Sequence, residues 1–251
     1  MHHVRAALAN DVPVFGAWTL STSPRMAETL ADALDWVGID TEHAPIGPER
    51  VESLVRAVEG HRATPIVRLP SVERAVDGDA KRALDAGAGG IIVPDVESRA
   101  DAERAVAAAT FPPEGERGVA GTTRANGYGT NFEEYVASAN EETLVVVQIE
   151  SPAGVDAVDE ILSVDGVDVA FVGENDLSSA MGHPGEKDHP DVAAATASVK
   201  AAADGNGVVP GIGGRTPETA RERIGAGYRF ILLGADLTFA RAGVERFRDA
   251  V

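Results

Sequence analysis

Short apolar runs alternate with longer amphipathic stretches along the chain, and this alternation most restricts its possible folds. Runs such as LVVVQIE at 144–150 and VDVAFVG at 167–173 are rich in β-branched residues, as are strands buried on both faces. Helical stretches between such strands are typical of βα units around a parallel sheet. The predicted strands are 13–19, 36–41, 64–69, 89–93, 144–149, 167–172, 207–212 and 229–234.

Proline and glycine mark the helices that follow these strands. Proline is tolerated in a first helical turn, and glycine commonly ends a helix. The predicted starts are Ser23-Pro24, Gly47-Pro48, Ser151-Pro152 and Thr216-Pro217, and the predicted stops are Gly60, Gly87 and Gly227. The chain of 251 residues has the usual length of one α/β barrel, so we expect a single (β/α)₈ domain over residues 1–251. An open doubly wound sheet is the alternative.

The composition excludes several classes of function. Forty acidic residues face 22 basic ones, and a net charge of −18 repels phosphate backbones, so no nucleic-acid partner is expected. We interpret this acidity as an adaptation to high salt, with an ordinary acidic cytosolic protein as the alternative. The sequence has no cysteine. It has no apolar stretch of membrane-spanning length and no signal-peptide core, so a cytoplasmic protein without a membrane partner is expected.

Two acidic residues follow neighbouring predicted strands at the rim where barrel active sites lie. Glu150 comes directly after the fifth strand, and Asp176 follows the sixth. Two unpaired carboxylates in a cleft raise each other's pKa, and a divalent cation between them removes that cost. Carboxylates with open positions for water or substrate oxygens suit Mg²⁺ or Mn²⁺. An ion pair with a nearby arginine, or solvated loop acids, is the alternative.

A histidine and an arginine also end strands at this rim. Of the six histidines, only His43 follows a predicted strand, where it has the chemistry of a general base. Asp40 would orient its ring if the chain leaves the strand near Glu42. Arg68 ends the run TPIVRL, where its planar guanidinium suits a carboxylate or an enolate. The alternatives are a hydrogen-bonded loop histidine and an arginine that only pairs with Asp40, Glu42 or Glu150.

The three lysines argue against an imine mechanism. Barrel aldolases of the Schiff-base type need a lysine on a strand that faces the site. Lys81 and Lys200 fall in predicted helices, and Lys187 falls in the loop GHPGEKDHP. We therefore expect a metal ion to take the electrophilic role.

A series of motifs gives the chain a family resemblance over nearly its whole length. The motifs are GAWTLSTSP at 16–24, DTEHAP at 40–45, VRLP at 67–70, GAGGIIVPDVES at 87–98, FPPEGERGVA at 111–120, VQIES at 147–151 and GVDVAFVGENDLSSAMGHPG at 166–185. In these motifs the chain resembles the HpcH/HpaI aldolases. These are metal-dependent class II pyruvate aldolases that include 4-hydroxy-2-oxoheptanedioate, 2-dehydro-3-deoxyglucarate and 2-keto-3-deoxyrhamnonate aldolases.

The resemblance implies a role for each candidate residue. The site residues it implies are Glu150 and Asp176 as metal ligands, His43 as base with Asp40 as its partner, Arg68 on the keto oxygen of pyruvate, Gln148 in the pocket, and the backbone of Gly173, Glu174, Asn175 and Asp176 on the substrate carboxylate. It also implies a barrel of the phosphoenolpyruvate/pyruvate-binding type. The expected assembly is a homo-hexamer, a dimer of trimers, with the last helix swapped between subunits.

The chain departs from the family at one position of the site. The family usually has Gly-Pro-Ala-Asp before Leu-Ser, whereas this chain has Gly173-Glu174-Asn175-Asp176. The metal-ligand position is retained, but Glu174 places an additional negative charge next to the expected carboxylate site. The glycine-rich segment GIGGR at 211–215 leaves more room near the aldehyde.

The sequence thus predicts a class II aldolase with Mg²⁺, Mn²⁺ or Co²⁺ as its cofactor. Its small-molecule partners would be a 2-oxo acid and an aldehyde, formed from a 2-keto-3-deoxy sugar acid or a hydroxy-oxo diacid through a metal-stabilised enolate. The alternatives are a malyl-CoA or citramalyl-CoA lyase on the same barrel, and a binding barrel without catalysis.

Overall fold

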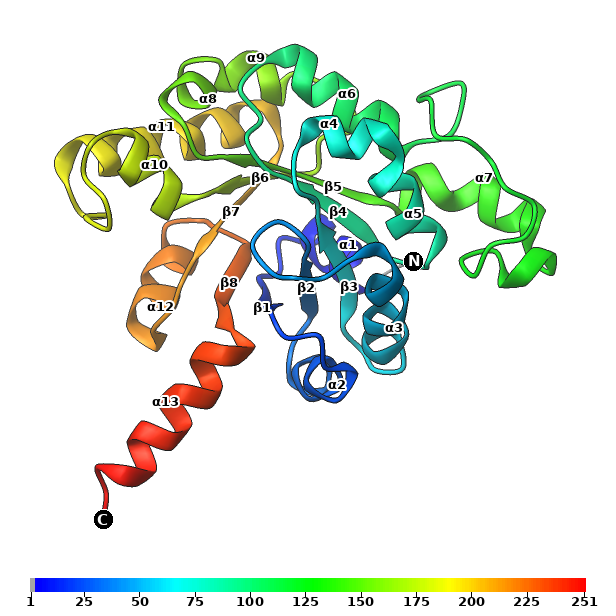
Figure 1. Cartoon of the computed structure of the whole chain (residues 1–251). Helices are drawn as coiled ribbons and strands as arrows, with labels where there is room; N and C mark the ends of the chain where they lie inside the picture. Colours follow the sequence, from blue (N-terminus) through cyan, green and yellow to red (C-terminus); the bar gives the residue numbers. More distant parts are fainter. Residues whose placement is uncertain (1–2) are drawn as a thin grey trace.

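The computed structural model describes residues 3–251 and has eight parallel strands in a closed barrel, in the order of the sequence (Figure 1). The strands are β1 Val14–Thr19, β2 Trp36–Asp40, β3 Thr64–Arg68, β4 Gly90–Val93, β5 Leu144–Ile149, β6 Val169–Val172, β7 Val209–Gly213 and β8 Phe230–Ala235. Each predicted strand is present, with ends that differ by at most two residues from the expected ones. The (β/α)₈ fold is therefore confirmed, and the open sheet is excluded.

Helices surround the barrel in the positions that proline and serine predict (Figure 1). Ser23, Ser151 and Thr216 each cap the helix that follows by accepting a backbone N–H in its first turn. The helical elements are α1 His3–Ala9, α2 Pro24–Ala33, α3 Pro48–Glu59, α4 Val72–Arg74, η1 Ala75–Asp79, α5 Ala80–Asp85, α6 Arg99–Ala109, η2 Gly127–Gly129, α7 Phe132–Glu142, α8 Pro152–Asp156, α9 Val158–Leu162, α10 Glu174–Ala180, α11 Pro190–Asn206, α12 Pro217–Gly225 and α13 Asp236–Arg248.

The inside of the barrel is filled with side chains, so the functional site has to lie at its rim. Trp36 is fully buried and stacks on Phe230 with ring centroids 4.3 Å apart. Gly16 makes room for this ring, because a Cβ there would lie 2.0 Å from Trp36. A larger apolar cluster packs between the strands and the outer helices. The barrel is therefore a closed core with one open carboxyl-terminal rim.

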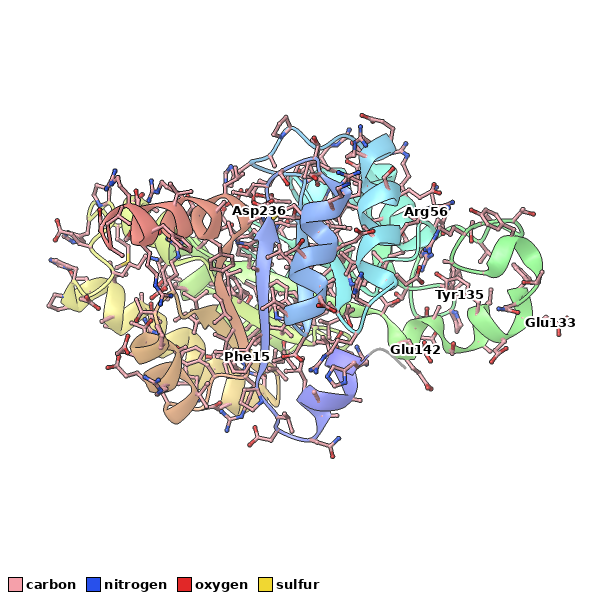
Figure 2. The ribbon with its side chains drawn as sticks, turned by 90° about the horizontal axis from the view of Figure 1, so that it is seen from below. Phe15, Arg56, Glu133, Tyr135, Glu142 and Asp236 are labelled. Carbon is pink, nitrogen blue, oxygen red and sulfur yellow. The ribbon has the colours of Figure 1, made fainter. Side chains whose placement is uncertain are left out.

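The last helix begins at this rim and leaves the barrel. The Asp236 carboxylate accepts hydrogen bonds from the Thr19 hydroxyl and the backbone amides of Leu20 and Ser21, each at 3.1 Å. These bonds tie the start of α13 to the tip of β1, where Figure 2 shows Asp236. Beyond that point α13 projects away from the other elements (Figure 1). Phe247 on this helix is 80% exposed.

No helix in residues 3–251 combines the length and the apolar character that crossing a membrane requires.

Candidate active site at the carboxyl rim of the barrel

An arginine and an aspartate form the buried centre of one wall of the rim. Strands β2 and β3 pair in a register that places Asp40 opposite Arg68. The guanidinium donates to both carboxylate oxygens of Asp40, from Nε at 3.0 Å and from Nη2 at 2.7 Å. Arg68 also lies over the Trp18 ring, 4.4 Å from its centroid. With Asp40 fully buried and Arg68 only 7% exposed, this bidentate pair fixes the guanidinium in one orientation.

The structure corrects the expected pairing of Asp40 with the His43 ring. Oδ1 of Asp40 accepts the backbone N–H groups of Glu42 and His43, at 3.0 and 3.3 Å. The carboxylate therefore closes the turn after β2, and its remaining lone pairs are taken by Arg68. The His43 ring is 62% exposed, and its Nε2 lies 3.8 Å from Oε2 of Glu42. The imidazole thus faces a different acid from the one that the spacing suggested.

Glu150 lies directly beyond β5 and is 4% exposed. Its Oε1 accepts the backbone N–H of Asp95 at 3.0 Å, and its Oε2 accepts from Nε2 of Gln148. Burial raises the pKa of Glu150 to about 7, although both hydrogen bonds favour the ionised form. Gly173 is required beside it, because a Cβ at that position would lie 2.3 Å from Oε2 of Glu150.

Two further carboxylates gather around Glu150: Glu42, expected only as a possible partner of Arg68, and Asp95, which had no expected role. Oxygen atoms of Glu42, Asp95 and Glu150 all lie within 4.8 Å of one another. Burial raises the pKa of Glu42 to about 7 despite the charge of Arg68, whose Nη1 lies 3.0 Å from its Oε2. Burial, then the charges of Glu97 and Asp176, raise the pKa of Asp95. Position is the signal that marks them, because each follows a strand end by two residues.

Asp176 is not a member of that three-carboxylate group; it lines a pocket at the rim, the rim pocket, whose lining does not include Glu42, Asp95 or Glu150. It stands in the first turn of α10, and its charge raises the pKa of both Glu42 and Asp95. The pocket brings together all but three of the predicted site residues: Arg68, Gln148, Gly173, Glu174, Asn175 and Asp176. A wider cavity of about 550 Å³ shares Arg68 and Asp176 with it and adds Asp40 and His43.

Glu174 does not add the uncompensated negative charge that the sequence suggested. Its side chain is 6% exposed, and its Oε1 accepts from Nη2 of Arg223 at 2.7 Å. Nζ of Lys187 lies 3.7 Å from its Oε2. Replacement of the usual proline by glutamate is therefore matched by a cation from α12, so this carboxylate does not oppose an incoming anion.

The residues at this rim fit a divalent cation. Their donors are carboxylate and amide oxygens, which Mg²⁺ and Mn²⁺ prefer. Oε1 of Gln148 is buried, has no hydrogen-bond partner among the described residues, and belongs to a side chain that lines the pocket. Within residues 3–251, these three acids have one adjacent guanidinium, that of Arg68, so their ionised forms are costly without a cation. The raised pKa of Glu42 and of Glu150 reflects this cost.

Comparisons with known proteins place this barrel among characterised relatives. The family model "HpcH/HpaI aldolase/citrate lyase" matches residues 14–242. A 5-keto-4-deoxy-D-glucarate aldolase from Salmonella arizonae is 39% identical over 98% of this chain and 94% of its own. A hydroxypyruvate/pyruvate aldolase from Paraburkholderia phytofirmans is 41% identical over 93% of this chain and 91% of its own.

A solved structure extends the likeness to three dimensions. The crystal structure of an HpcH/HpaI aldolase/citrate lyase family protein from Burkholderia cenocepacia superposes with a TM-score of 0.93 and 39% identity. The match covers 100% of this chain and 99% of that one. Because the family model, the relatives and the fold agree over almost the whole sequence, the chain belongs to the HpcH/HpaI aldolase/citrate lyase family.

Proposed function

We propose that the chain is a metal-dependent aldolase that reversibly cleaves a 4-hydroxy-2-oxo acid to pyruvate and an aldehyde. The observation that carries this proposal is the carboxyl rim, where the carboxylates of Glu42, Asp95 and the buried Glu150 gather beside the fixed guanidinium of Arg68. That arrangement binds a cation and an anionic oxygen next to each other, as enolate chemistry requires. The aldolase names of relatives at 39% and 41% identity support the same reaction.

Glu150 and Asp176 are the proposed ligands of the cation, which would be Mg²⁺, Mn²⁺ or Co²⁺. When bound, the cation supplies a Lewis acid for the carboxylate and keto oxygens of the 2-oxo acid. Arg68 donates to the keto oxygen as negative charge develops there. Its bidentate pair with Asp40 holds the guanidinium in the orientation that this hydrogen bond needs. Gln148 offers its amide to the same part of the pocket, and backbone amides from Gly173 to Asp176 receive the substrate carboxylate.

His43 is the proposed general base of cleavage. Its exposed ring stands at the mouth of the pocket, where it takes the proton of the substrate hydroxyl as the carbon–carbon bond breaks. In this assignment Asp40 supports Arg68 and the turn that carries His43, and it does not receive a proton.

An assay of pyruvate release, with and without added metal, tests the function. Purified protein is stripped of metal, reloaded with Mn²⁺ or Mg²⁺, and offered a panel of 2-keto-3-deoxy sugar acids and hydroxy-oxo diacids. We expect pyruvate release that stops with chelator, and metal-dependent deuterium exchange at the methyl group of pyruvate. Cleavage confined to malyl-CoA or citramalyl-CoA would favour the related thioester lyase. Absence of both pyruvate release and exchange would leave a binding barrel.

The raised pKa of Glu42 and of Glu150 gives a pH dependence. Each carboxyl has a folded-state pKa of about 7, above its ordinary value of 4.5. The metal-free fold therefore loses stability as pH rises through about 7, because both groups must then ionise while buried. A cation competes with those protons, so its affinity should rise between pH 6 and 8, by up to about tenfold per pH unit for each proton released.

Calorimetric titration of Mn²⁺ at pH 6, 7 and 8, with melting temperatures measured with and without the metal, checks this prediction. The gain in melting temperature on adding Mn²⁺ should grow with pH, while the metal-free melting temperature should fall. Equal Mn²⁺ affinity at all three pH values would contradict it.

The remaining properties are proposals that rest on sequence and surface. The exposed apolar side chains of α13, among them Val244 and Phe247, suit a helix covered by a neighbouring copy, in line with the swapped homo-hexamer. We further propose one catalytic domain over residues 1–251, a cytoplasmic location, and dependence on high salt that follows from the charge of −18. The molar mass from light scattering tests the hexamer. The melting temperature at low and high salt tests the dependence on salt.

A further inference from the structure

The rim pocket has a wall with surplus positive charge. Glu174, Lys187 and Arg215 line this wall, and Arg223 supports it from α12. The Glu174 carboxylate is balanced by Arg223 at 2.7 Å, while its contact with Lys187 is 3.7 Å long. One acid therefore stands among three cations, and the balance at this wall is positive.

Arg215 contributes most clearly to this surplus. Within residues 3–251 no ion pair or hydrogen bond engages its guanidinium. Burial lowers the pKa of Lys187, and the nearby charge of Arg215 lowers it further, so the two cations repel each other. In a chain with 40 acids and 22 basic residues, two adjacent cations beside a single acid that already pairs with Arg223 require an explanation.

Local structure fixes the backbone that carries both cations. The loop that carries Lys187 is closed by stacking of His183 on His189, with ring centroids 3.4 Å apart. The Ser178 hydroxyl accepts the amide of Gly185 at 3.2 Å in the same loop. Arg215 directly precedes Thr216, which begins α12 with a reciprocal capping box. The backbone positions from which the two cations reach the pocket are thus fixed by the fold.

We propose that Lys187 and Arg215 bind an anionic group on the aldehyde half of the substrate. This inference rests on the proposed aldolase function. Arg68, Gln148 and Asp176 lie in the same pocket and would receive the pyruvate half, so the other half extends toward the remaining wall. An anion there gains charge-assisted hydrogen bonds from both side chains and removes their mutual repulsion. The substrate is then an acid at both ends, which separates it from 2-keto-3-deoxy acids that yield a neutral aldehyde.

Aldol addition of pyruvate to matched acceptors tests this subsite. One pair is 4-oxobutanoate and its methyl ester, and the other is glyceraldehyde 3-phosphate and glyceraldehyde. The measured quantity is the ratio of kcat/KM for the charged acceptor to that for its neutral counterpart. We expect a ratio well above one for at least one pair, and that pair identifies the anion as carboxylate or phosphate.

Three variants and one control make the test specific to these side chains. Arg215→Gln and Lys187→Gln should each lower the ratio roughly tenfold, the low end for a hydrogen bond to a charged group because Arg215 is exposed. Arg215→Glu should bring the ratio to one or below. Arg221→Gln removes the same charge from an exposed position on α12, where it pairs with Glu218, and should keep the wild-type ratio.

The outcomes separate this inference from the proposed function. Deuterium exchange into the methyl group of pyruvate needs no aldehyde and reports the enolate half of the reaction alone. Exchange together with a ratio near one in both pairs would overturn the anionic subsite and leave the aldolase proposal standing. A high ratio that both glutamine variants retain would also overturn it. Absence of exchange in the wild-type protein would instead overturn the aldolase proposal.

Discussion

Glu150→Gln is expected to abolish metal binding and activity while leaving the fold at least as stable. The substitution keeps the shape of the side chain, and its amide oxygen still accepts the Asp95 N–H that Glu150 accepts at 3.0 Å. Its NH2 group replaces the oxygen that accepts from Nε2 of Gln148, and it can donate to the unpartnered Oε1 of Gln148 when that amide turns over. It removes the negative charge that a cation requires. We expect Mn²⁺ affinity to fall by more than about 100-fold, and kcat/KM by about 10³-fold or more.

Stability should respond in the opposite sense. Glu150 is 4% exposed, and burial raises its pKa to about 7, so its ionised form weakens the metal-free fold above that pH. The neutral amide removes this cost, and the metal-free variant should melt at the wild-type temperature or above it at pH 8. A melting temperature well below wild type would show that the loss of activity reflects damage to the fold.

A control from the other end of the barrel separates a local effect from a general loss of charge. Asp168 is a half-buried acid at the start of β6, with Oδ1 2.8 Å from Arg5. Asp168→Asn removes one negative charge far from the rim and should leave Mn²⁺ affinity within about twofold, since screening weakens long-range contributions. Calorimetry on both variants decides the matter. Wild-type Mn²⁺ affinity in Glu150→Gln would remove this residue from the proposed ligands.

Arg68→Ala should be the most damaging single change at the rim, because it lowers both the stability of the fold and the rate of the reaction. The guanidinium pairs with Asp40, which is fully buried, and with Glu42 at 3.0 Å. Truncation leaves both carboxylates without a counter-charge. Breaking a buried pair from one side costs about 3–5 kcal/mol, so we expect a loss of that order in the free energy of unfolding at pH 8.

The same substitution removes the proposed donor to the keto oxygen. Loss of such a donor costs roughly 10²–10³-fold in kcat. Arg68→Lys retains the charge but cannot make the bidentate contact with Asp40, so it should recover part of the stability and little of the activity. Denaturant unfolding and metal-dependent deuterium exchange, measured on the same samples, distinguish the two effects.

Arg5→Ala provides the matched control for stability. Arg5 donates to the Thr143 carbonyl at 2.8 Å and pairs with Asp168 at the opposite end of the barrel. Its removal should lower the free energy of unfolding without reducing the exchange rate per folded molecule. Exchange at the wild-type rate in Arg68→Ala would contradict the role given to Arg68. Unchanged stability would contradict the buried ion-pair network.

Most of the fold could be predicted because its signals are local. A run of β-branched residues such as β5 marks a strand buried on both faces wherever it stands in the chain. Ser23 and Thr216 predict helix starts, because each caps its helix through hydrogen bonds within one turn. Position at strand ends likewise placed Arg68 and Glu150 at one rim, because the carboxyl ends of parallel strands meet there.

The partners of these residues could not be predicted in the same way. The spacing suggested that Asp40 serves the His43 ring, but the parallel register of β2 and β3 gives its carboxylate to Arg68. Glu174 suggested an added negative charge, but Arg223 is 49 residues away in sequence and lies 2.7 Å from it. Lys187 was set aside as a loop residue, yet the loop brings it to the pocket wall.

The sequence by itself determined the eight βα units, their order, and which polar residues stand at the ends of strands. Side-chain periodicity and helix capping depend on residues that are near one another in the sequence, so they can be read without the fold. Only the tertiary structure decided which charged groups lie together: Glu42 and Asp95 beside Glu150, and Arg215 without a partner among residues 3–251. Coulomb energy depends on distance through space and on burial, and closure of the barrel sets both.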